Sequence, residues 1–370
     1  MQTSKLNILY IEPFYTGSHK KWIDTYKKYS KHNIKILGLP GKKWKWRMHG
    51  GAITLAKMYN RLKDNFDLII CSDMLNLPVF KSLCNNKRPI KTIMYFHENQ
   101  LSYPWSPLDK DLVLKRDLHY YYINYTSSLV SDYNYFNSIY HLESYIKGLK
   151  KYLKKMPDLR NHDTIDEIYN KSSVLPIGCN LENFDKTKVE SPIILWNHRW
   201  EYDKNPELFF KILFKLKNEN IDFKLIVLGE KYKEYPEIFD IAQRKLKNEI
   251  IHFGYCKSQI EYINWIKMSN ILPITSNQDF FGISIVEGVG YGNYPILPKR
   301  LSYPEIFQYK NNMDLFYTKD EELFNIIIEV INNITKLNQR INKLSSSIYK
   351  KYNWKTISKK YDQTFESFFN

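Results

Sequence analysis

The segment Asn277–Pro304, NQDFFGISIVEGVGYGNYPILPKRLSYP, decides the fold of this chain. Within it, Ile283–Tyr291 is apolar at helical spacing, and Tyr294–Leu297 is a short apolar run of the kind that forms a buried strand. A helix joined to a buried strand by only a few residues is typical of a parallel α/β sheet. The segment therefore predicts one helix and one strand of a doubly wound domain.

The same alternation of strands and helices extends through most of the chain. In the second half we expect strands at Ile193–Asn197, Lys224–Leu228, Ile250–Phe253 and Ile271–Ile274, and helices at Pro206–Lys217 and Gln259–Ser269. In the first half the expected strands are Leu6–Ile11, Ile34–Leu39, Asp67–Cys71, Thr92–Phe96, Tyr133–Phe136 and Ser173–Pro176, and the expected helices are Lys20–Ser30, Leu108–Ser128 and Ser138–Leu153. Such a pattern predicts βαβ units.

A chain of 370 residues is long enough for two such domains. We predict an N-terminal Rossmann-like domain over 1–185, a C-terminal one over 190–345, and a last helix over 346–370 that crosses back to the first domain. Parallel sheets bind ligands at the carboxyl ends of their strands. The expected site therefore lies where these ends face each other across a cleft.

The amino-acid composition limits the classes of protein to which this chain can belong. Hydrophobic residues make up 43% and charged residues 25%, which is typical of a globular chain. The longest apolar runs have about five or six residues, too few for a membrane span, so no stable membrane insertion is expected. Four scattered cysteines indicate reduced thiols and a cytoplasmic location. The net charge of +16 suggests nucleic acid or membrane phosphate as a partner, although a lysine-rich composition alone produces the same excess.

Two acids in the opening segment are candidates for binding a sugar nucleotide. Asp279 and Glu287 are separated by seven residues, and Gly282 lies where the loop turns into the helix. A glycine allows close approach of a ligand, and the N–H groups at the helix start, from Gly282 and Ile283, suit an anion. We expect Glu287 to accept hydrogen bonds from ribose and Asp279 to meet a sugar.

A second candidate follows the strand in Ile193–Pro206, IILWNHRWEYDKNP. Arg199 and Lys204 should emerge at the carboxyl end of this strand, where a guanidinium and an ammonium suit a diphosphate. The alternative is a surface ion pair of Arg199 with Glu201 or Asp203.

Two loops of the first half complete the expected site. Gly17, Ser18 and His19 follow the first strand in EPFYTGSHK, and a turn there can face a phosphate or a sugar, with Gly17 and Ser18 expected to bind the donor. His97, Glu98 and Asn99 end another strand in FHENQ and should point toward the ligand. A histidine in the core is the alternative for His97.

Nucleic-acid contacts are expected in Pro40–His49, which interleaves basic residues with tryptophans. Stacking on bases beside phosphate contacts is one interpretation, and a loop with tryptophans packed between helices is the other. The candidates for RNA contact are Lys42, Lys43, Trp44, Trp46 and Arg47, with Arg160 in Pro157–His162. No metal site is expected, because the only D-x-D motif, Asp109–Asp111, falls at a helix start and no His/Cys cluster has ligand spacing.

Six stretches together resemble the tRNA-queuosine mannosyltransferases, a branch of the retaining Glu-x7-Glu glycosyltransferases. They are ILYIEPFYTGSHK, LPGKKWKWRMHG, MYFHENQLSYP, FNSIYHLES, ILWNHRWEYDKNPE and DFFGISIVEGVGYGNYPILPKRLSYPEIF, and they lie between Leu6 and Phe307. The resemblance implies a GT-B fold of two Rossmann-like domains, GDP-mannose as donor with no metal or other cofactor, and the cyclopentenediol of queuosine at the wobble position of tRNA as acceptor.

The resemblance also assigns roles to residues. It implies that Arg199 and Lys204 hold the donor diphosphate, that Glu287 holds the ribose, and that Gly17 and His97 line the reacting centre. The class usually has Glu at the first acid position, where this chain has Asp279, so the identity of the sugar is the least constrained implication. His97, Arg199, Lys204 and Asp279 are the expected catalytic residues.

Two other functions compete with this one. A glycosyltransferase of the same fold acting on a lipid-linked or cell-envelope acceptor would use an amphipathic, lysine-rich helix, and Glu143–Lys155 is a candidate for it. A non-catalytic tRNA-binding protein is the other, and the set of Arg199, Lys204 and Glu287 argues against it. A Rossmann dehydrogenase is not supported, because no GxGxxG follows a strand.

Overall fold

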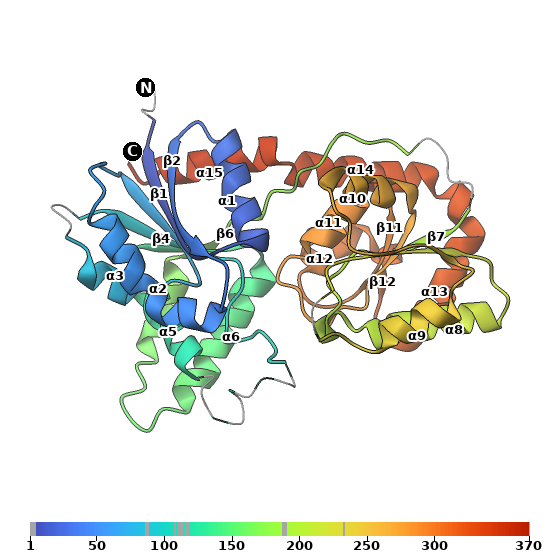
Figure 1. Cartoon of the computed structure of the whole chain (residues 1–370), viewed down its shortest axis with the longest axis horizontal. Coiled ribbons are helices and arrows are strands. Elements are labelled where there is room, and N and C mark those ends of the chain that lie inside the picture. The colour runs from blue at the N-terminus through green and yellow to red at the C-terminus, as the bar shows by residue number, and fades with distance from the viewer. Residues whose placement is uncertain are drawn as a thin grey trace. The chain divides into compact units, whose positions relative to one another are not determined.

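The computed structural model describes residues 5–85, 89–106, 109, 111, 114, 118–186, 191–231 and 234–369. The chain divides into two compact units (Figure 1). Unit 1 comprises residues 1–178 and 354–370, and unit 2 comprises residues 179–353.

Unit 1 is built on a six-stranded parallel sheet with the strand order β2-β1-β3-β4-β5-β6. The order reverses beside β1, which pairs with both β2 and β3. Its elements are β1 Asn7–Tyr15, α1 Gly17–Tyr29, β2 Asn33–Pro40, α2 Trp44–Tyr59, β3 Leu68–Ser72, α3 Leu77–Leu83, β4 Lys91–Phe96, α5 Leu118–Val130, β5 Tyr133–Phe136, α6 Ile139–Lys154, α7 Asp163–Asn170, β6 Ser172–Val174 and α15 Trp354–Glu366.

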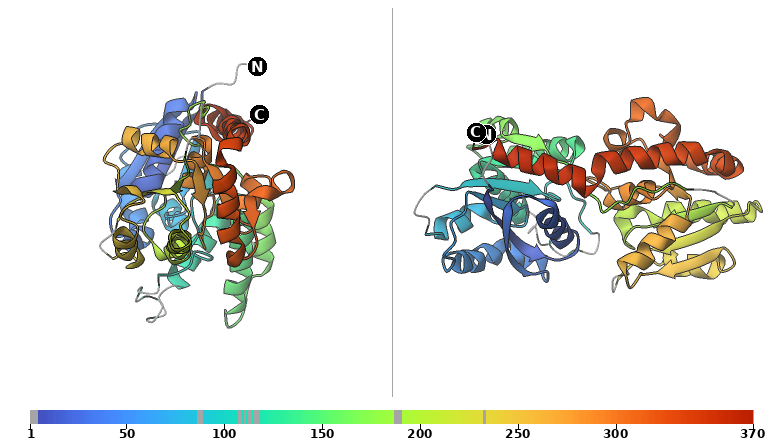
Figure 2. Two further views of the ribbon diagram at one scale, coloured as in Figure 1. Left: turned by 90° about the vertical axis from the view of Figure 1, so that its right-hand side faces the viewer. Right: turned by 90° about the horizontal axis from the view of Figure 1, so that it is seen from above.

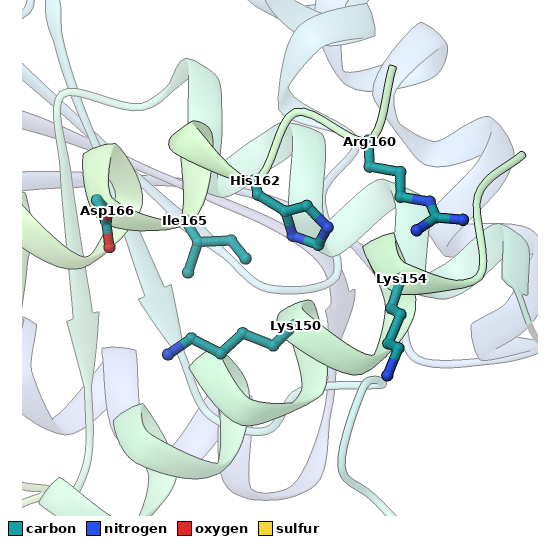
Figure 3. A pocket seen from close by; sticks show the side chains of 6 residues that line it. All are labelled: Lys150, Lys154, Arg160, His162, Ile165 and Asp166. Carbon is teal, nitrogen blue, oxygen red and sulfur yellow. The ribbon is translucent and has the colours of Figure 1, made fainter. Parts of the chain in front are cut away.

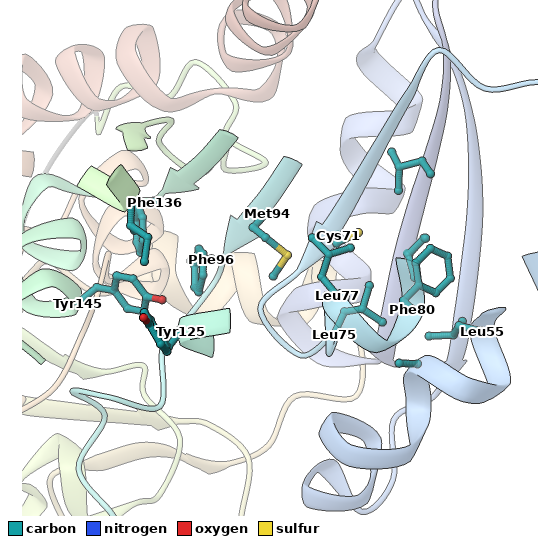
Figure 4. Close-up of a cluster of buried hydrophobic side chains, with 14 of the residues drawn as sticks. Leu55, Cys71, Leu75, Leu77, Phe80, Met94, Phe96, Tyr125, Phe136 and Tyr145 are labelled. Carbon is teal, nitrogen blue, oxygen red and sulfur yellow. The ribbon is translucent and has the colours of Figure 1, made fainter. Parts of the chain in front are cut away.

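The core of unit 1 lies between this sheet and its helices. All five residues of β3, LIICS, are buried, as expected of a central strand covered on both faces. Figure 4 shows the aromatic part of the core, where the rings of Phe96 and Phe136 stack with centroids 4.6 Å apart. Tyr145 of α6 packs against both rings. Burial of these side chains fixes β4, β5 and α6 relative to one another.

The last helix, α15, belongs to unit 1 although it follows unit 2 in the sequence. It lies beside α1, as the red and blue ribbons show in Figure 2. The Tyr361 hydroxyl donates to the carbonyl of Pro176 over 2.8 Å and accepts from the indole N–H of Trp22 over 3.2 Å. Aromatic packing and buried hydrogen bonds therefore attach the end of the chain to its first half.

Unit 2 has its own six-stranded parallel sheet, in the order β12-β11-β10-β7-β8-β9. Its strands and helices are β7 Ile193–Trp196, α8 Pro206–Asn218, β8 Lys224–Leu228, α9 Ile238–Lys245, β9 Ile250–Gly254, α10 Gln259–Met268, β10 Ile271–Pro273, α11 Ile283–Gly290, β11 Tyr294–Pro298, α12 Tyr303–Ile306, β12 Phe316–Tyr317, α13 Asp320–Asn333 and α14 Asn338–Tyr352. In α11 the residues Ile285–Gly290 are all buried, because the helix packs against β10, β11 and α14.

The predicted alternation is found, with differences at short or irregular elements. Pro40–His49 is not a loop, since α2 begins at Trp44. Helix α2 contains Gly50 and Gly51, which have low helix propensity. The packing of α2 in the folded unit therefore outweighs the local propensity of these residues. The helix expected from Leu108 is described from Leu118, and most of 107–117 lies outside the described residues.

Within the described part of the chain, every helix is too short or too polar to cross a bilayer.

Candidate functional site

Lys204 is the centre of a buried polar cluster in unit 2. It follows β7 in a short 3-10 turn, Tyr202–Lys204, and only 8% of its side chain is exposed. Its Nζ lies 2.9 Å from Asp203 and 3.1 Å from Asp279, and it donates to the carbonyl of Gln278 over 2.6 Å. Burial lowers the pKa of Lys204, but Asp279 and Asp203 outweigh it and raise the pKa, so the ammonium is charged.

Asp279 is held in place from two sides. Its second oxygen accepts a hydrogen bond of 2.6 Å from the hydroxyl of Tyr303, at the start of α12. Burial raises the pKa of Asp279, but Lys204, His198 and Tyr303 lower it below its usual value. The sequence predicts Asp279 as a site residue, and the structure adds that this carboxylate is ionised and fixed.

His198 is a residue of this cluster that sequence reasoning missed. It follows β7, is 4% exposed, and its Nδ1 lies 3.1 Å from the hydroxyl of Ser284 in α11. Burial lowers the pKa of His198 to about 4, with Lys204 adding to the effect and Asp279 opposing it. The imidazole is therefore neutral at pH 7, and its Nε2 has no hydrogen-bond partner among the described residues. Its position directly before Arg199, after a buried strand, is the signal that could have found it.

Arg199 lies in the next position and is half-exposed. Its guanidinium is 3.5 Å from Glu201, which is the surface ion pair considered as the alternative. An ion pair with 46% exposure of the arginine is worth about 0–1 kcal/mol, so a stronger anion can displace it.

Glu287 lies in α11, 4% exposed, and accepts a hydrogen bond of 3.1 Å from the hydroxyl of Tyr262 in α10. Gly282 caps the start of the helix with φ 81°, and a Cβ there would come within 3.1 Å of Ile285 and 3.3 Å of Tyr303. The N–H groups of Ile283 and Ser284 open α11 and suit an anion, whereas those of Ile285 and Val286 donate to the carbonyl of Gly282. Glycine, free N–H groups and a buried carboxylate thus meet at one helix start.

In unit 1 a buried ion pair lies at the carboxyl ends of β1 and β3. Glu12 is fully buried and lies 3.0 Å from Nδ1 of His19 in α1. The other contacts of its carboxylate are the Tyr10 and Ser72 hydroxyls and the N–H of Phe14, at 2.9–3.0 Å. Burial opposes charge on both groups, but their attraction prevails: the pKa of Glu12 is lowered, and the pKa of His19 is raised to about 9.

His97 lies against this pair. The rings of His19 and His97 are 4.3 Å apart, and the N–H of His97 donates to Asp73 over 2.8 Å. Burial and the charge on His19 keep the pKa of His97 well below its usual value, so its ring is neutral. Burial raises the pKa of Asp73 to about 8, with Glu98 adding to the effect. The sequence predicts His97 and names His19 in the turn after the first strand, but it does not predict Glu12 and Asp73 or the contacts among the four residues.

The other predicted residues of these loops differ in exposure. Gly17, at φ 52°, and Ser18 are exposed, and a Cβ on Gly17 would meet nothing within 4 Å, so a ligand has room there. Glu98 accepts from the side chain of Gln100 over 3.1 Å. Asn99 is buried, and its side-chain oxygen accepts from Ser102 of the same turn, so it supports the loop from inside.

The residues predicted for RNA contact lie in two places. Trp44 packs against Trp105 and Tyr120, whereas Trp46 is 63% exposed and Arg47 donates to the carbonyl of Pro40. Lys42 and Lys43 are exposed beside them. Arg160 is distant from these in the sequence and lines a pocket at α6 and α7.

Two sets of possible metal ligands come together through the fold. They are Glu12, His19 and His97, and His252, Cys256 and Glu261, with the ligand atoms of each set within 4.8 Å of one another. In the first set, Glu12 and Nδ1 of His19 are already bonded to each other. In the second, Glu261 accepts from the N–H of Lys257 over 3.0 Å. The D-x-D motif is also occupied, since Asp109 and Asp111 both pair with Lys45 at 2.6 Å.

Two family models together match most of the chain. Residues 7–179 match the family described as tRNA-queuosine alpha-mannosyltransferase N-terminal, and residues 180–346 match glycosyl transferases group 1. A tRNA-queuosine alpha-mannosyltransferase of Drosophila melanogaster is 33% identical over 338 residues, which are 88% of each chain.

Solved structures share the fold at low identity. Sucrose-phosphate synthase from Thermosynechococcus elongatus is 13% identical with a TM-score of 0.72, over 99% of both chains. A glycosyltransferase from Rickettsia africae is 18% identical with a TM-score of 0.68, also over 99% of both chains. HepE of Anabaena in complex with UDP-glucose is 13% identical with a TM-score of 0.69, over 98% of this chain and all of that one.

The predicted two-domain α/β fold of GT-B type is confirmed by the two parallel sheets and these structural relatives. The resemblance found in the sequence is confirmed as well, through both family matches and the fly relative. The chain belongs to the tRNA-queuosine alpha-mannosyltransferase family.

Proposed function

We propose that this protein transfers mannose from GDP-mannose, with retention of configuration, to the cyclopentenediol of queuosine at the wobble position of tRNA. The observation that carries the proposal is the arrangement around α11, where the Lys204–Asp279 cluster and buried Glu287 flank a glycine-capped helix start. This cluster lies in the region that matches group 1 glycosyl transferases, and unit 1 carries the queuosine-specific match. Four free cysteines fit a cytoplasmic location.

The donor diphosphate would bind where the start of α11, Lys204 and Arg199 provide positive charge. The N–H groups at the start of α11, the Lys204 ammonium and the Arg199 guanidinium together offer charge and directed donors. Asp203 and Asp279 keep Lys204 charged but also occupy it. A bound diphosphate would therefore share the ammonium with the two carboxylates.

The chemistry needs no nucleophile from the protein and no metal. The bond between the anomeric carbon and the β-phosphate oxygen breaks, and the acceptor hydroxyl attacks the same face of the sugar. Its proton passes to the departing phosphate, which leaves as GDP. Lys204, Arg199 and the helix N-terminus stabilise the charge that grows on this phosphate. His198 is neutral with a free Nε2, which can bond a sugar hydroxyl without adding charge.

Unit 1 would supply the acceptor side through His97 and Glu98, while its exposed Gly17–Ser18 turn would contact the donor. A neutral His97 can accept from or donate to a diol hydroxyl, and burial together with the adjacent His19 cation keeps it uncharged.

A transfer assay tests the proposal directly. Purified protein is incubated with radiolabelled GDP-mannose and with bulk tRNA that contains or lacks queuosine. We expect label only in queuosine-containing tRNA. If GDP-mannose binds but no tRNA is labelled, the acceptor is wrong, and assays with lipid-linked acceptors would follow. Hydrolysis of the product by an α-mannosidase but not a β-mannosidase would confirm retention.

Arg199→Ala is expected to lower kcat/KM for transfer by about 100-fold, on the order of 3 kcal/mol, because one cation beside the leaving diphosphate is lost. The arginine is half-exposed, so the variant should fold normally. Arg244→Ala, an exposed arginine of α9, is the control. Turnover of Arg199→Ala close to wild type would remove Arg199 from the site.

Tyr262→Phe is expected to weaken GDP-mannose binding about tenfold, because Glu287 loses the hydroxyl that orients it toward the ribose. Since ribose contacts are equal in ground and transition states, kcat should change little. Calorimetric titration with GDP-mannose measures the effect, and Tyr255→Phe, at an exposed position, is the control. An unchanged Kd would mean that Tyr262 does not position Glu287.

A further inference from the structure

Helix α6 of unit 1 has two faces of different chemistry. Its apolar face, with Leu142, Tyr145, Leu149, Tyr152 and Leu153, is buried in the core. Its exposed side and the segment after it carry Lys147, Lys150, Lys151, Lys154, Lys155 and Arg160, which we call the α6 basic surface.

The cations of the α6 basic surface are not neutralised. None of them pairs with a carboxylate of the described chain, and Arg160 uses only its Nε, toward the carbonyl of Met156. Elsewhere in unit 1, Lys35 pairs with Asp64 and Lys171 with Glu167. The helix dipole accounts for lysines in the last turn of α6, such as Lys151 and Lys154, but not for Lys147, Lys150 and Arg160.

Part of this surface is hollowed. A pocket of about 490 Å³ is lined by Lys150, Lys154, Arg160, His162, Ile165 and Asp166. In Figure 3 the two lysines come from α6, while Arg160 and His162 come from the segment that leads into α7. Three of the six side chains are permanent cations and one is a carboxylate, so the pocket suits an anion.

The first turn of α6 is connected by hydrogen bonds to the segment that contains His97. The Asn137 side chain donates to the carbonyl of His97 and bonds His141 in the first turn of α6, both over 2.9 Å. A helix of 16 residues is about 24 Å long. The cations near its end therefore lie about 20 Å from His97 within one unit. A bound RNA whose loop reaches His97 has to carry its backbone across such a distance.

A membrane surface fits α6 less well. A helix that lies on a bilayer inserts its apolar face among the lipids. The apolar face of α6 is already buried against β4, β5 and their neighbours, as Tyr145 between Phe96 and Phe136 shows. Its exposed side carries the cations of the α6 basic surface, with Ile139 and Glu143 near its start, and phosphates of an RNA backbone can meet these cations without rearrangement.

We propose that the α6 basic surface binds the sugar–phosphate backbone of the acceptor tRNA, away from the nucleotide that is modified. The inference rests on the proposed function, because it assumes a tRNA acceptor. Contacts of this kind position a nucleic acid without reading its sequence. They add affinity and position the tRNA on the protein, while the loop residues near His97 select the base to be modified.

The test is a triple variant, Lys150→Ala, Lys154→Ala and Arg160→Ala, in the full-length protein. Its matched control is Lys355→Ala, Lys359→Ala and Lys360→Ala, three exposed lysines of α15 in the same unit. Binding of tRNA is measured by fluorescence anisotropy between 50 and 200 mM salt. Transfer kinetics and GDP-mannose affinity are measured beside it.

The slope of log K against log salt is negative for binding of this kind. We expect its magnitude to be smaller by about 2–3 in the triple variant than in the wild type. Over this fourfold salt range the wild type should then lose about 15- to 60-fold more affinity than the variant. KM for tRNA should rise, while kcat at saturating tRNA and the Kd for GDP-mannose stay unchanged. The control should behave as the wild type does.

Other outcomes overturn the inference in distinguishable ways. If the wild type binds tRNA and the triple variant binds with the same slope, the surface is not used, and the proposed function stands. If the control loses as much as the triple variant, the effect is general charge. If the triple variant no longer sediments with phosphatidylserine vesicles as the wild type does, but still binds tRNA normally, the surface binds a membrane instead. A wild type that binds GDP-mannose but no tRNA would refute the proposed function as well.

Discussion

Replacing Lys204 by alanine is expected to lower kcat for mannose transfer by about 10²–10³-fold, since the ammonium neutralises charge on the departing diphosphate. Single-turnover transfer to queuosine-containing tRNA measures this. Lys211→Ala, an exposed lysine of α8 in the same unit, should keep normal turnover. Turnover of the Lys204→Ala enzyme within threefold of wild type would exclude Lys204 from the transition state.

The same substitution has a structural effect that must be separated from catalysis. Without the ammonium, Asp203 and Asp279 remain buried and lose the cation that contacts both of them. Removing one partner of a buried pair costs about 3–5 kcal/mol of stability. In the double variant with Asp279→Asn, one of the charges is gone and part of this stability should return. Transfer should stay low, because the buried ammonium beside the diphosphate is still absent.

Glu12→Gln is expected to lower the free energy of unfolding of unit 1 by about 3–5 kcal/mol near pH 6, because His19 loses its buried carboxylate partner. Unfolding of this unit alone can be followed by oxidation of buried Met48 and Met94 in urea, with detection by mass spectrometry. Glu143→Gln, at an exposed position of α6, is the control. Equal protection of both methionines in Glu12→Gln and wild type would contradict a stabilising ion pair.

The pair also predicts how stability depends on pH. Folding raises the pKa of His19 from 6.5 to about 9, so the folded protein binds this proton more tightly than the unfolded chain. The resulting stabilisation, on the order of 3 kcal/mol, is complete below pH 6.5 and is lost as pH rises through 9. The raised pKa of Asp73 acts in the same direction. Stability of unit 1 should therefore fall from pH 6.5 to 9 in the wild type and fall less in Glu12→Gln.

The sequence by itself determined the fold class and most of its elements. Strands β5 and β8 have the predicted bounds, Tyr133–Phe136 and Lys224–Leu228, because apolar runs of this length between polar residues have few other solutions. The short helices α3, α7 and α9, of seven or eight residues, were not predicted. Helices this short depend on tertiary packing for their stability, so local pattern is a weak guide to them.

Motifs in the sequence also indicated single site residues, such as Lys204, Asp279 and Glu287, because each lies within a few residues of a strand end or helix start. What each of them touches was decided by the tertiary structure. Tyr303 reaches Asp279 from 24 residues away, and Tyr262 reaches Glu287 from 25.

The buried cluster of unit 1 shows the same limit more strongly. Glu12, Asp73 and His97 come from three strands that are neighbours only because the sheet orders them as β1-β3-β4. Periodicity reports whether a side chain faces inward, and it says nothing of which other side chain it meets there. Burial in a close-packed core sets those pairs, and with them the charge states of His19, His97 and His198. Local sequence patterns therefore predicted the fold and the candidate residues. The contacts of each side chain and the protonation states of the histidines followed only from long-range packing.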